Sequence, residues 1–318
     1  MLFMSKQFIR LLVMLLGITL LDFIFFELAQ SSNTLIPVSP LEYLSSYQQF
    51  LFQMFQGDFG TIHPSNEAIL QQFFIKLPAS LELIIPSILI AWLVGVPLAV
   101  MAVKKPLGWV DRIVQFLGSL IYSLPVFWWG LILLIIFSTG LEWFPVGGRL
   151  DYIYDIQTQT GSALIDTLLS TQSYANEAFF DALSRTFLPI LTLAMLPTAY
   201  ITLQIRSHLE ETLQYDYMKS AKARGMSHSR IIWLHGLPNA IQPVLNSMSL
   251  QFSMLITSTI IVEFIYSWPG LGHWFLVLVQ RQDYLALRGA LMLIASAILL
   301  ANTVTDILKY WSNPRLQR

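Results

Sequence analysis

The chain has 318 residues, of which 55% are apolar and only 12% charged, whereas about 25% are charged in ordinary soluble domains. A formal net charge of -1 argues against a nucleic-acid surface, and the absence of cysteine excludes a disulfide framework, a thiolate metal site and a cysteine nucleophile. The composition therefore predicts a membrane protein.

Six apolar segments are long enough to cross a bilayer as helices, which rise about 1.5 Å per residue. They are the segments 11–28, 81–103, 113–137, 187–203, 244–264 and 287–308. The first exceeds the roughly 7–15 apolar residues of a signal-peptide core, so we favour a retained anchor over a signal peptide cut near Ala29 or Ser31. Pro86, Pro125 and Pro197 interrupt later segments, which implies a packed bundle whose neighbouring helices satisfy the freed carbonyl groups. The expected fold class is all-α, a polytopic bundle of six transmembrane helices.

Basic residues divide unevenly between the two sides that six spans create. Thirteen share the side of the N-terminus: Lys6, Arg10, Lys104, Lys105, Arg112, Arg206, Lys219, Lys222, Arg224, Arg230, Lys309, Arg315 and Arg318. Five lie opposite: Lys76, Arg149, Arg185, Arg281 and Arg288. Because Lys and Arg concentrate in cytoplasmic loops, we expect both termini in the cytoplasm. The divisions are a cytoplasmic N-terminus 1–10, a first span 11–28, a periplasmic segment 29–78, a core 79–310 with a cytoplasmic loop 206–238, and a cytoplasmic tail 311–318.

Within that loop, residues 217–238 predict a short helix, a break and a second short helix. Residues 217–224 are good helix formers, and Gly225 suits the left-handed position that closes a helix. Ser227 is placed to cap the next helix, and Pro238 begins the path toward the fifth span. We expect Gly225→Val to be strained and Gly236→Ala to be milder, because position 236 asks less of the backbone.

This stretch resembles the loop that defines ABC-transporter permeases, in which Glu-Ala-Ala is followed by three residues, Gly, nine residues and Ile-x-Leu-Pro. Lys219-Ser220-Ala221 stands in the first three places, Gly225 follows at the family's spacing, and His235-x-Leu237-Pro238 closes the pattern. The Glu and the Ile of the family are replaced here. The resemblance implies that the ATPase contacts Tyr217, Lys219, Ala221, Ala223, Gly225, Leu237 and Pro238. A plain basic loop with a helix break is the alternative.

Other stretches are similar to landmarks of the dipeptide/oligopeptide/nickel permeases, in the family's order and over nearly the whole chain. They are Gly57-Asp58-Phe59-Gly60, Pro125-Val126-Phe127-Trp128, Phe144-Pro145-Val146-Gly147-Gly148-Arg149, Pro269-Gly270-Leu271-Gly272 and Arg281-Gln282-Asp283-Tyr284. The outer-loop signature comprises Pro269, Gly270, Gly272, Arg281 and Asp283. We interpret Pro269-Gly270-Leu271-Gly272 as a tight turn that shapes the outer mouth. Residues 148–151 and 160–166 look most like the Sap-type peptide transport permeases.

The resemblance implies a permease subunit of an ATP-driven ABC transporter in the bacterial inner membrane, with a bundle like that of type I importers, that forms half of the translocation pathway. The direction of transport depends on whether a periplasmic binding protein delivers the cargo. Its implied partners are a second homologous permease subunit, two ABC ATPase subunits, a periplasmic substrate-binding protein and the lipid bilayer. No Gly-x-x-x-x-Gly-Lys-Ser/Thr occurs, so the chain itself needs no cofactor, and ATP and Mg would be bound by the ATPase partners. A membrane-embedded enzyme has no motif in its favour, and a passive channel is the remaining alternative. Relatives carry peptides, nickel or, in the Sap-type branch, cationic (antimicrobial) peptides or polyamines.

Two acidic residues, Asp22 and Glu82, lie near the outer ends of their spans. Ionisable groups within a membrane are candidates for substrate contact, but residues near helix ends also reach the interface or pair with a neighbour, which we favour. The five histidines His63, His208, His228, His235 and His273 share no metal-ligand spacing, so we expect no metal site.

Overall fold

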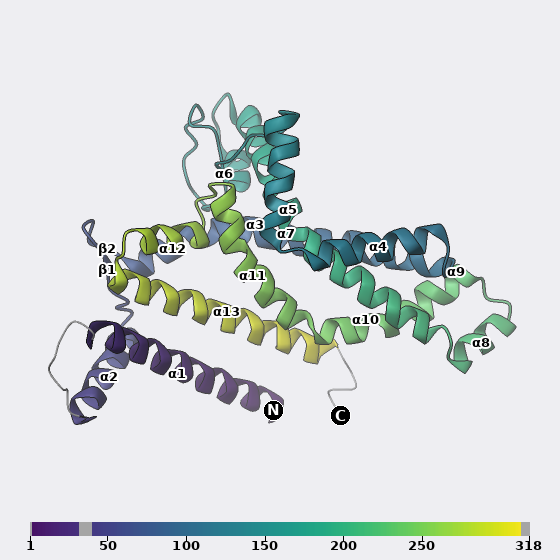
Figure 1. The fold of residues 1–318 in the computed structure, drawn as a ribbon, viewed down its shortest axis with the longest axis horizontal. Coiled ribbons are helices and arrows are strands. Elements are labelled where there is room, and N and C mark those ends of the chain that lie inside the picture. Colours follow the sequence, from purple (N-terminus) through teal and green to yellow (C-terminus); the bar gives the residue numbers. More distant parts are fainter. Residues whose placement is uncertain (1, 32–39, 313–318) are drawn as a thin grey trace.

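The computed structural model describes residues 2–31 and 40–312, and helices make up most of that part (Figure 1). The elements are α1 (Leu2–Ser31), α2 (Pro40–Phe55), β1 (Thr61–Ile62), β2 (Glu67–Ala68), α3 (Ile69–Lys104), α4 (Trp109–Ser123), α5 (Val126–Leu133), the π-helical η1 (Leu134–Gly140), α6 (Ala163–Leu169), α7 (Ala175–Thr212), α8 (Asp216–Ala223), α9 (His228–Ile231), the π-helical η2 (Ile232–Gly236), α10 (Leu237–Asn246), α11 (Met248–Ile265), α12 (Leu271–Gln280) and α13 (Tyr284–Ser312). The two strands form one small antiparallel hairpin, with Thr61 opposite Ala68. The prediction of a helical, polytopic membrane protein is confirmed.

Five of the described helices are long and apolar enough to cross a membrane: α1, α3, α7, α11 and α13. The expected span 113–137 is instead a broken pair, because α4 and the α5–η1 segment meet at 104°. Leu124 has extended backbone angles (φ -103°, ψ 142°), since a residue that precedes proline is pushed out of the helical region. Counted as one span, the broken pair brings the total to the six that the sequence predicts.

Several helices are longer than their apolar segments. Helix α3 begins at Ile69, so the end of the segment 29–78 is helical and Pro78 lies inside a helix. Helix α7 extends well beyond both ends of the expected span 187–203. Cross-helix hydrogen bonds accompany the internal prolines, as where Ser87 Oγ donates to Ile190 O (3.1 Å) between α3 and α7. The residues 313–318 of the expected tail lie outside the described residues.

Helices α1 and α13 run antiparallel. Arg10 near the start of α1 pairs with Asp306 near the end of α13 (3.7 Å), and Asp22 pairs with Arg288 at the opposite end (2.9 Å). The beginning of the first helix and the end of the last one therefore lie on the same side of the bundle, as expected.

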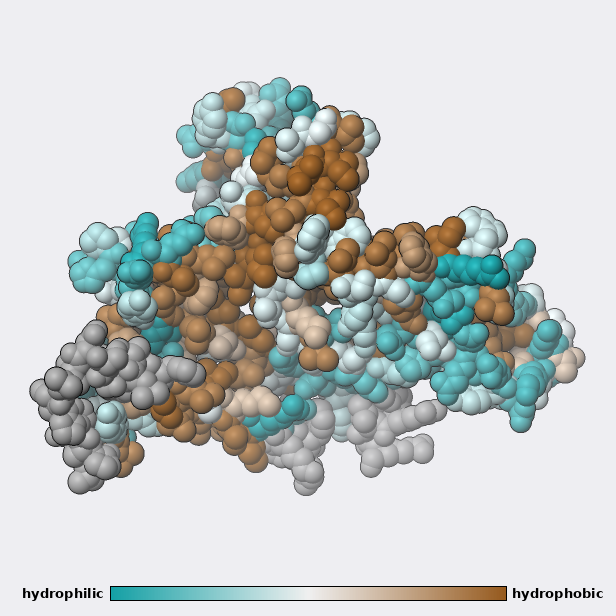
Figure 2. Space-filling view, in the orientation of Figure 1, coloured by the Kyte–Doolittle hydropathy of each residue, from teal (hydrophilic) through white to brown (hydrophobic). Residues whose placement is uncertain are grey.

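The long helices place two different structures at the ends of the bundle. Helices α8 and α9 lie at one end, whereas the β1–β2 hairpin and α12 lie at the other (Figure 1). We call these the elbow end and the hairpin end. In the face shown in Figure 2, hydrophobic residues cover the middle, and hydrophilic residues gather toward the elbow end, toward the hairpin end and at the top around α6. A broad apolar surface between polar regions is typical of a chain that spans a bilayer.

Candidate functional site

The segment Asp216–Gly236, which we call the elbow, is built as the sequence predicts in its first half. Helix α8 ends before Gly225, whose φ of +84° is the left-handed conformation that favours glycine. The turn is closed by backbone hydrogen bonds from Gly225 N to Lys222 O (3.0 Å) and from Met226 N to Ala221 O (3.4 Å). A Cβ at Gly225 would meet no atom within 4 Å. Backbone conformation alone therefore accounts for glycine at this position.

The second half of the elbow differs from the prediction. Ser227 stands at the start of α9, but its side chain makes no capping hydrogen bond. Helix α9 continues through η2 into α10 without a break, so Pro238 does not restart the chain. Pro238 stands directly after the π-helical η2, at the start of α10, and it lacks the N–H that another residue would donate to the preceding turn.

The base of the elbow is tied to the membrane helices by two adjoining apolar clusters. Met218, Ala221 and Ile231 are buried together, with Leu213 packed against them. Leu213 also packs against the main cluster of α3 and α7, which includes Ile232 and Leu237 of the elbow end. The elbow is therefore packed continuously onto α7 and α3, and close-packed interiors transmit strain.

The residues predicted to contact an ATPase separate into two sets. Ala221 and Leu237 are buried and hold the elbow to the bundle. The others are exposed: Tyr217, Lys219, Ala223, Gly225 and Pro238. The exposed surface also contains Trp233 and Leu234, which are 45% and 56% exposed. The sequence analysis did not single out these two as surface residues.

The charges on the elbow are mostly basic. Lys222, Arg224 and Arg230 are exposed, and Lys219 Nζ pairs with Asp216 (2.9 Å). The hydrogen bond from Lys219 lowers the pKa of the exposed Asp216 carboxyl. Together with Tyr217 and Trp233, these groups make a basic and aromatic surface suited to an acidic or aromatic-lined partner.

A buried ion pair braces α7 just before the elbow. Asp111 of α4 is fully buried and accepts both Nε (2.8 Å) and Nη2 (2.9 Å) of Arg206. The same carboxylate accepts Leu107 N (2.9 Å) and the Gln115 amide (3.0 Å). Arg206 also pairs with Glu210 (2.5 Å), one turn further along α7. The start of α4 is thereby locked to the part of α7 that leads into α8.

The glycines of the predicted outer-loop signature surround a carboxylate that the sequence analysis did not single out. Glu263, fully buried near the end of α11, accepts hydrogen bonds from Gly272 N (2.7 Å), His273 N (3.0 Å) and Ser80 Oγ (2.5 Å). A Cβ on Gly270 would lie 2.3 Å from Glu263 Oε1, and one on Gly272 would lie 2.3 Å from Ile260 Cα. These glycines therefore permit close packing. A single acidic residue within an apolar run was the signal that could have revealed the site.

The other predicted acidic residues are held in ion pairs or at a helix start. Glu82 pairs with Arg149 (2.6 Å) and accepts Ser162 Oγ (2.7 Å), while Asp22 pairs with Arg288. Asp283 accepts Ala286 N (3.1 Å) at the start of α13 and His63 N (2.8 Å) from the hairpin. These contacts give both intramembrane carboxylates the partner that we favoured over a substrate role.

The chain is similar to transport permeases over nearly its whole length. Residues 93–318 match the family described as binding-protein-dependent transport system inner membrane component. The di/tripeptide transport system permease protein DppB of Pseudomonas aeruginosa is 39% identical over 85% of this chain and 81% of that protein. The peptide transport system permease protein SapB of Salmonella typhimurium is 36% identical, and the putrescine export system permease protein SapB of Escherichia coli K12 is 34% identical, each over 96% of this chain and 95% of the relative.

Proposed function

Because the chain belongs to the family of binding-protein-dependent transport system inner membrane components, we propose that it conducts peptides or related cationic solutes as one half of an ATP-driven pathway. It is a permease subunit of an ABC transport system in the bacterial inner membrane. Peptides are the first substrate class, because relatives of both the DppB and the SapB type are named for them. A polyamine is the second, because one relative is a putrescine permease.

The elbow is the observation that carries the mechanism. Its exposed basic and aromatic surface offers a docking site, and its buried base continues into the cluster of α3 and α7. A motor that displaces the elbow therefore displaces the helices that enclose the pathway.

The chain itself performs no catalysis in this mechanism, and two partner ATPase subunits bind ATP and Mg and supply the force. A second permease subunit completes the pathway, and a periplasmic binding protein delivers the cargo. The elbow and both termini face the cytoplasm.

Substitutions of Gly225 test the elbow with a matched pair of variants. Gly225→Val places a β-branched residue at a φ of +84°, at a cost of about 1–3 kcal/mol. Asparagine adopts this conformation far more readily, and neither side chain meets a neighbour within 4 Å at its Cβ. Gly225→Val should weaken ATPase association about 5- to 150-fold and abolish uptake, whereas Gly225→Asn should retain both. Co-purification of the ATPase subunits and uptake in cells measure the two effects.

The effect of Gly236→Ala depends on side-chain packing as well as on backbone conformation. The φ of Gly236 is an ordinary -75°, but a Cβ there would lie 2.7 Å from Leu209 Cδ1 in the buried cluster of α3 and α7. Because that atom is the end of a flexible side chain that can shift, and because the backbone at Gly236 is ordinary, we expect Gly236→Ala to remain the milder variant. Full ATPase association and full transport in Gly225→Val would show that the elbow is not the coupling element.

A further inference from the structure

Helix α11 presents two chemically different sides. Phe252, Ile256 and Ile260 line an apolar groove together with α3 and α13. Gln251 and Ser258 lie seven residues apart and share another side, because seven residues are close to two helical turns. That side lines a second groove, which encloses about 590 Å³. One helix therefore separates a groove with few polar side chains from a second groove, whose largely apolar lining includes several polar side chains.

The second groove opens where α4 and α5 break apart. Pro125 has no N–H to offer to Ile121 O, and the Trp129 indole donates to that carbonyl instead (3.2 Å). The break holds Tyr122 and Ser123 at the groove, opposite α11 and beside Pro197 of α7. The distortion of this span therefore creates the groove and is stabilised by a specific hydrogen bond.

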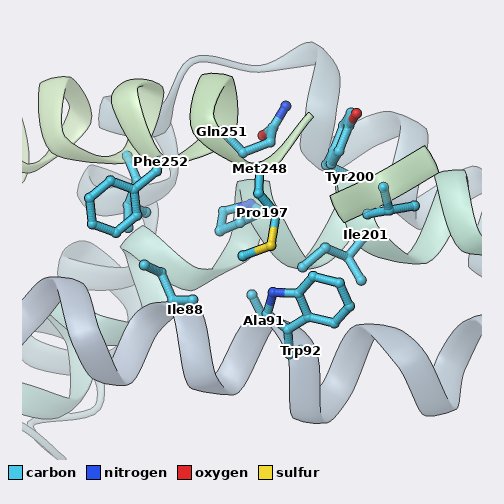
Figure 3. Close-up of a pocket in the computed structure, with 11 residues that line it drawn as sticks. Ile88, Ala91, Trp92, Pro197, Tyr200, Ile201, Met248, Gln251 and Phe252 are labelled. Atoms are coloured by element: carbon cyan, nitrogen blue, oxygen red, sulfur yellow. The ribbon is translucent and has the colours of Figure 1, made fainter. Parts of the chain in front are cut away.

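Three polar side chains at the groove remain free to bind. Within residues 2–31 and 40–312, the side chains of Tyr122, Gln251 and Ser258 make no hydrogen bond to the protein. By contrast, Ser253 bonds to Asn302 of α13 (2.9 Å) and Ser249 bonds to Asp306 (2.5 Å), which joins the two helices. Figure 3 shows that Gln251 and Tyr200 direct their polar ends away from Ile88, Ala91 and Trp92. The amide of Gln251 therefore does not point into the small apolar cavity that these residues line between α3, α7 and α11.

Free polar groups in a spanning segment are not expected to face lipid, because unsatisfied hydrogen-bonding groups are costly in hydrocarbon. A water-filled passage satisfies them. All of the side chains that line the groove are uncharged, the polar ones being Tyr122, Ser123, Gln251, Ser253, Thr257 and Ser258. Such a surface exchanges hydrogen bonds with main-chain amides of a cargo but offers no counter-charge to its side chains.

We propose that this groove is the wall of the translocation pathway that the chain contributes, and that Tyr122, Gln251 and Ser258 contact the main chain of a passing peptide. The proposal rests on the proposed function and adds the site to it. The second permease subunit covers the open side of the groove, and the apolar groove on the other side of α11 lies outside the pathway.

Cysteine labelling tests the location of the pathway, and the chain has no native cysteine to interfere. Gln251→Cys and Ser258→Cys are placed singly in the complete transporter, with Ile256→Cys on the apolar side as the matched control. A membrane-impermeant sulfonated maleimide applied to permeabilised cells should label the first two and spare the third. Labelling of Ile256→Cys without Ser258→Cys, or equal labelling of all three, would overturn the assignment. This result does not depend on what the cargo is.

Charge substitution tests the chemistry of the contact. Ser258→Asp should raise the ratio of cationic to anionic dipeptide uptake about 3- to 10-fold over wild type, the effect of one charge about 7 Å away in a watery passage. Ser258→Lys should lower that ratio, and Ser258→Asn should leave it unchanged. An unaltered ratio in both charged variants would refute contact at this position. Absence of uptake of both dipeptides and longer peptides by the wild-type complex would reject peptides as cargo, while the labelling pattern would still decide the pathway.

Discussion

Removing one partner of the Asp111–Arg206 pair should destabilise the transporter unequally. Arg206→Met leaves a fully buried carboxylate with only Leu107 N and Gln115 as partners, and an uncompensated buried charge costs about 3–5 kcal/mol. Asp111→Asn leaves an arginine that still pairs with Glu210 and whose side chain is 12% exposed. The loss of stability should therefore be closer to that of one charged hydrogen bond, about 1.5–3 kcal/mol. The double variant should cost less than the sum of the two, because neither charge is then stranded.

Thermal unfolding of the purified complex in detergent, at one scan rate, measures the difference. At about 2 °C for each kcal/mol in a chain of this size, Arg206→Met should lower Tm by about 6–10 °C and Asp111→Asn by about 3–6 °C. Uptake should fall with stability, since the pair braces the helix that leads into the elbow. Equal losses for the two single variants, or strict additivity in the double variant, would show that Asp111 is solvated and that the pair does not brace α7.

Two further predictions concern packing and orientation. Gly289→Ala should destabilise the bundle by about 3 kcal/mol or more, because its Cβ would lie 2.0 Å from Phe59 O. Gly17→Ala is the control and should not destabilise it, because a Cβ at position 17 meets no atom within 4 Å. Expression and Tm are measured for both variants, and equal values for the two would contradict the prediction. Single cysteines are placed at the exposed positions Ser65, Ser173 and Ser229. A membrane-impermeant thiol reagent added to the outside of sealed cells should label the cysteines at positions 65 and 173 and spare the one at 229. Labelling at position 229 would reverse the orientation.

Local features of this chain were predictable because they depend on near neighbours. The apolar segments predicted the spans, since hydrocarbon demands about 20 apolar residues of any helix that crosses it. The left-handed turn at Gly225 was predictable because a helix followed by glycine closes in that way whatever surrounds it. The motif spacing placed the elbow correctly, although the sequence did not show that Ala221 and Leu237 face inward while Trp233 faces outward.

Proline shows where local reasoning stops. Pro125 and Pro197 both stand within apolar segments, and both predict a disturbed helix. Yet α7 continues through Pro197, whereas the span breaks by 104° at Pro125. The outcome depends on packing, because α7 is held along its length by α3 and the Trp129 indole satisfies a carbonyl at the break.

The amino-acid sequence by itself determined that this protein is a helical membrane bundle with an elbow, and that it resembles a family of transport permeases. Only the tertiary structure decided which charges meet. Asp111 lies 95 positions from Arg206, and Ser80 lies 183 positions from Glu263, so no periodicity links them. Each pair exists because α4 lies against α7, or α3 against α11. That packing depends on the summed fit of many side chains along the helices, which short-range pattern and spacing do not contain.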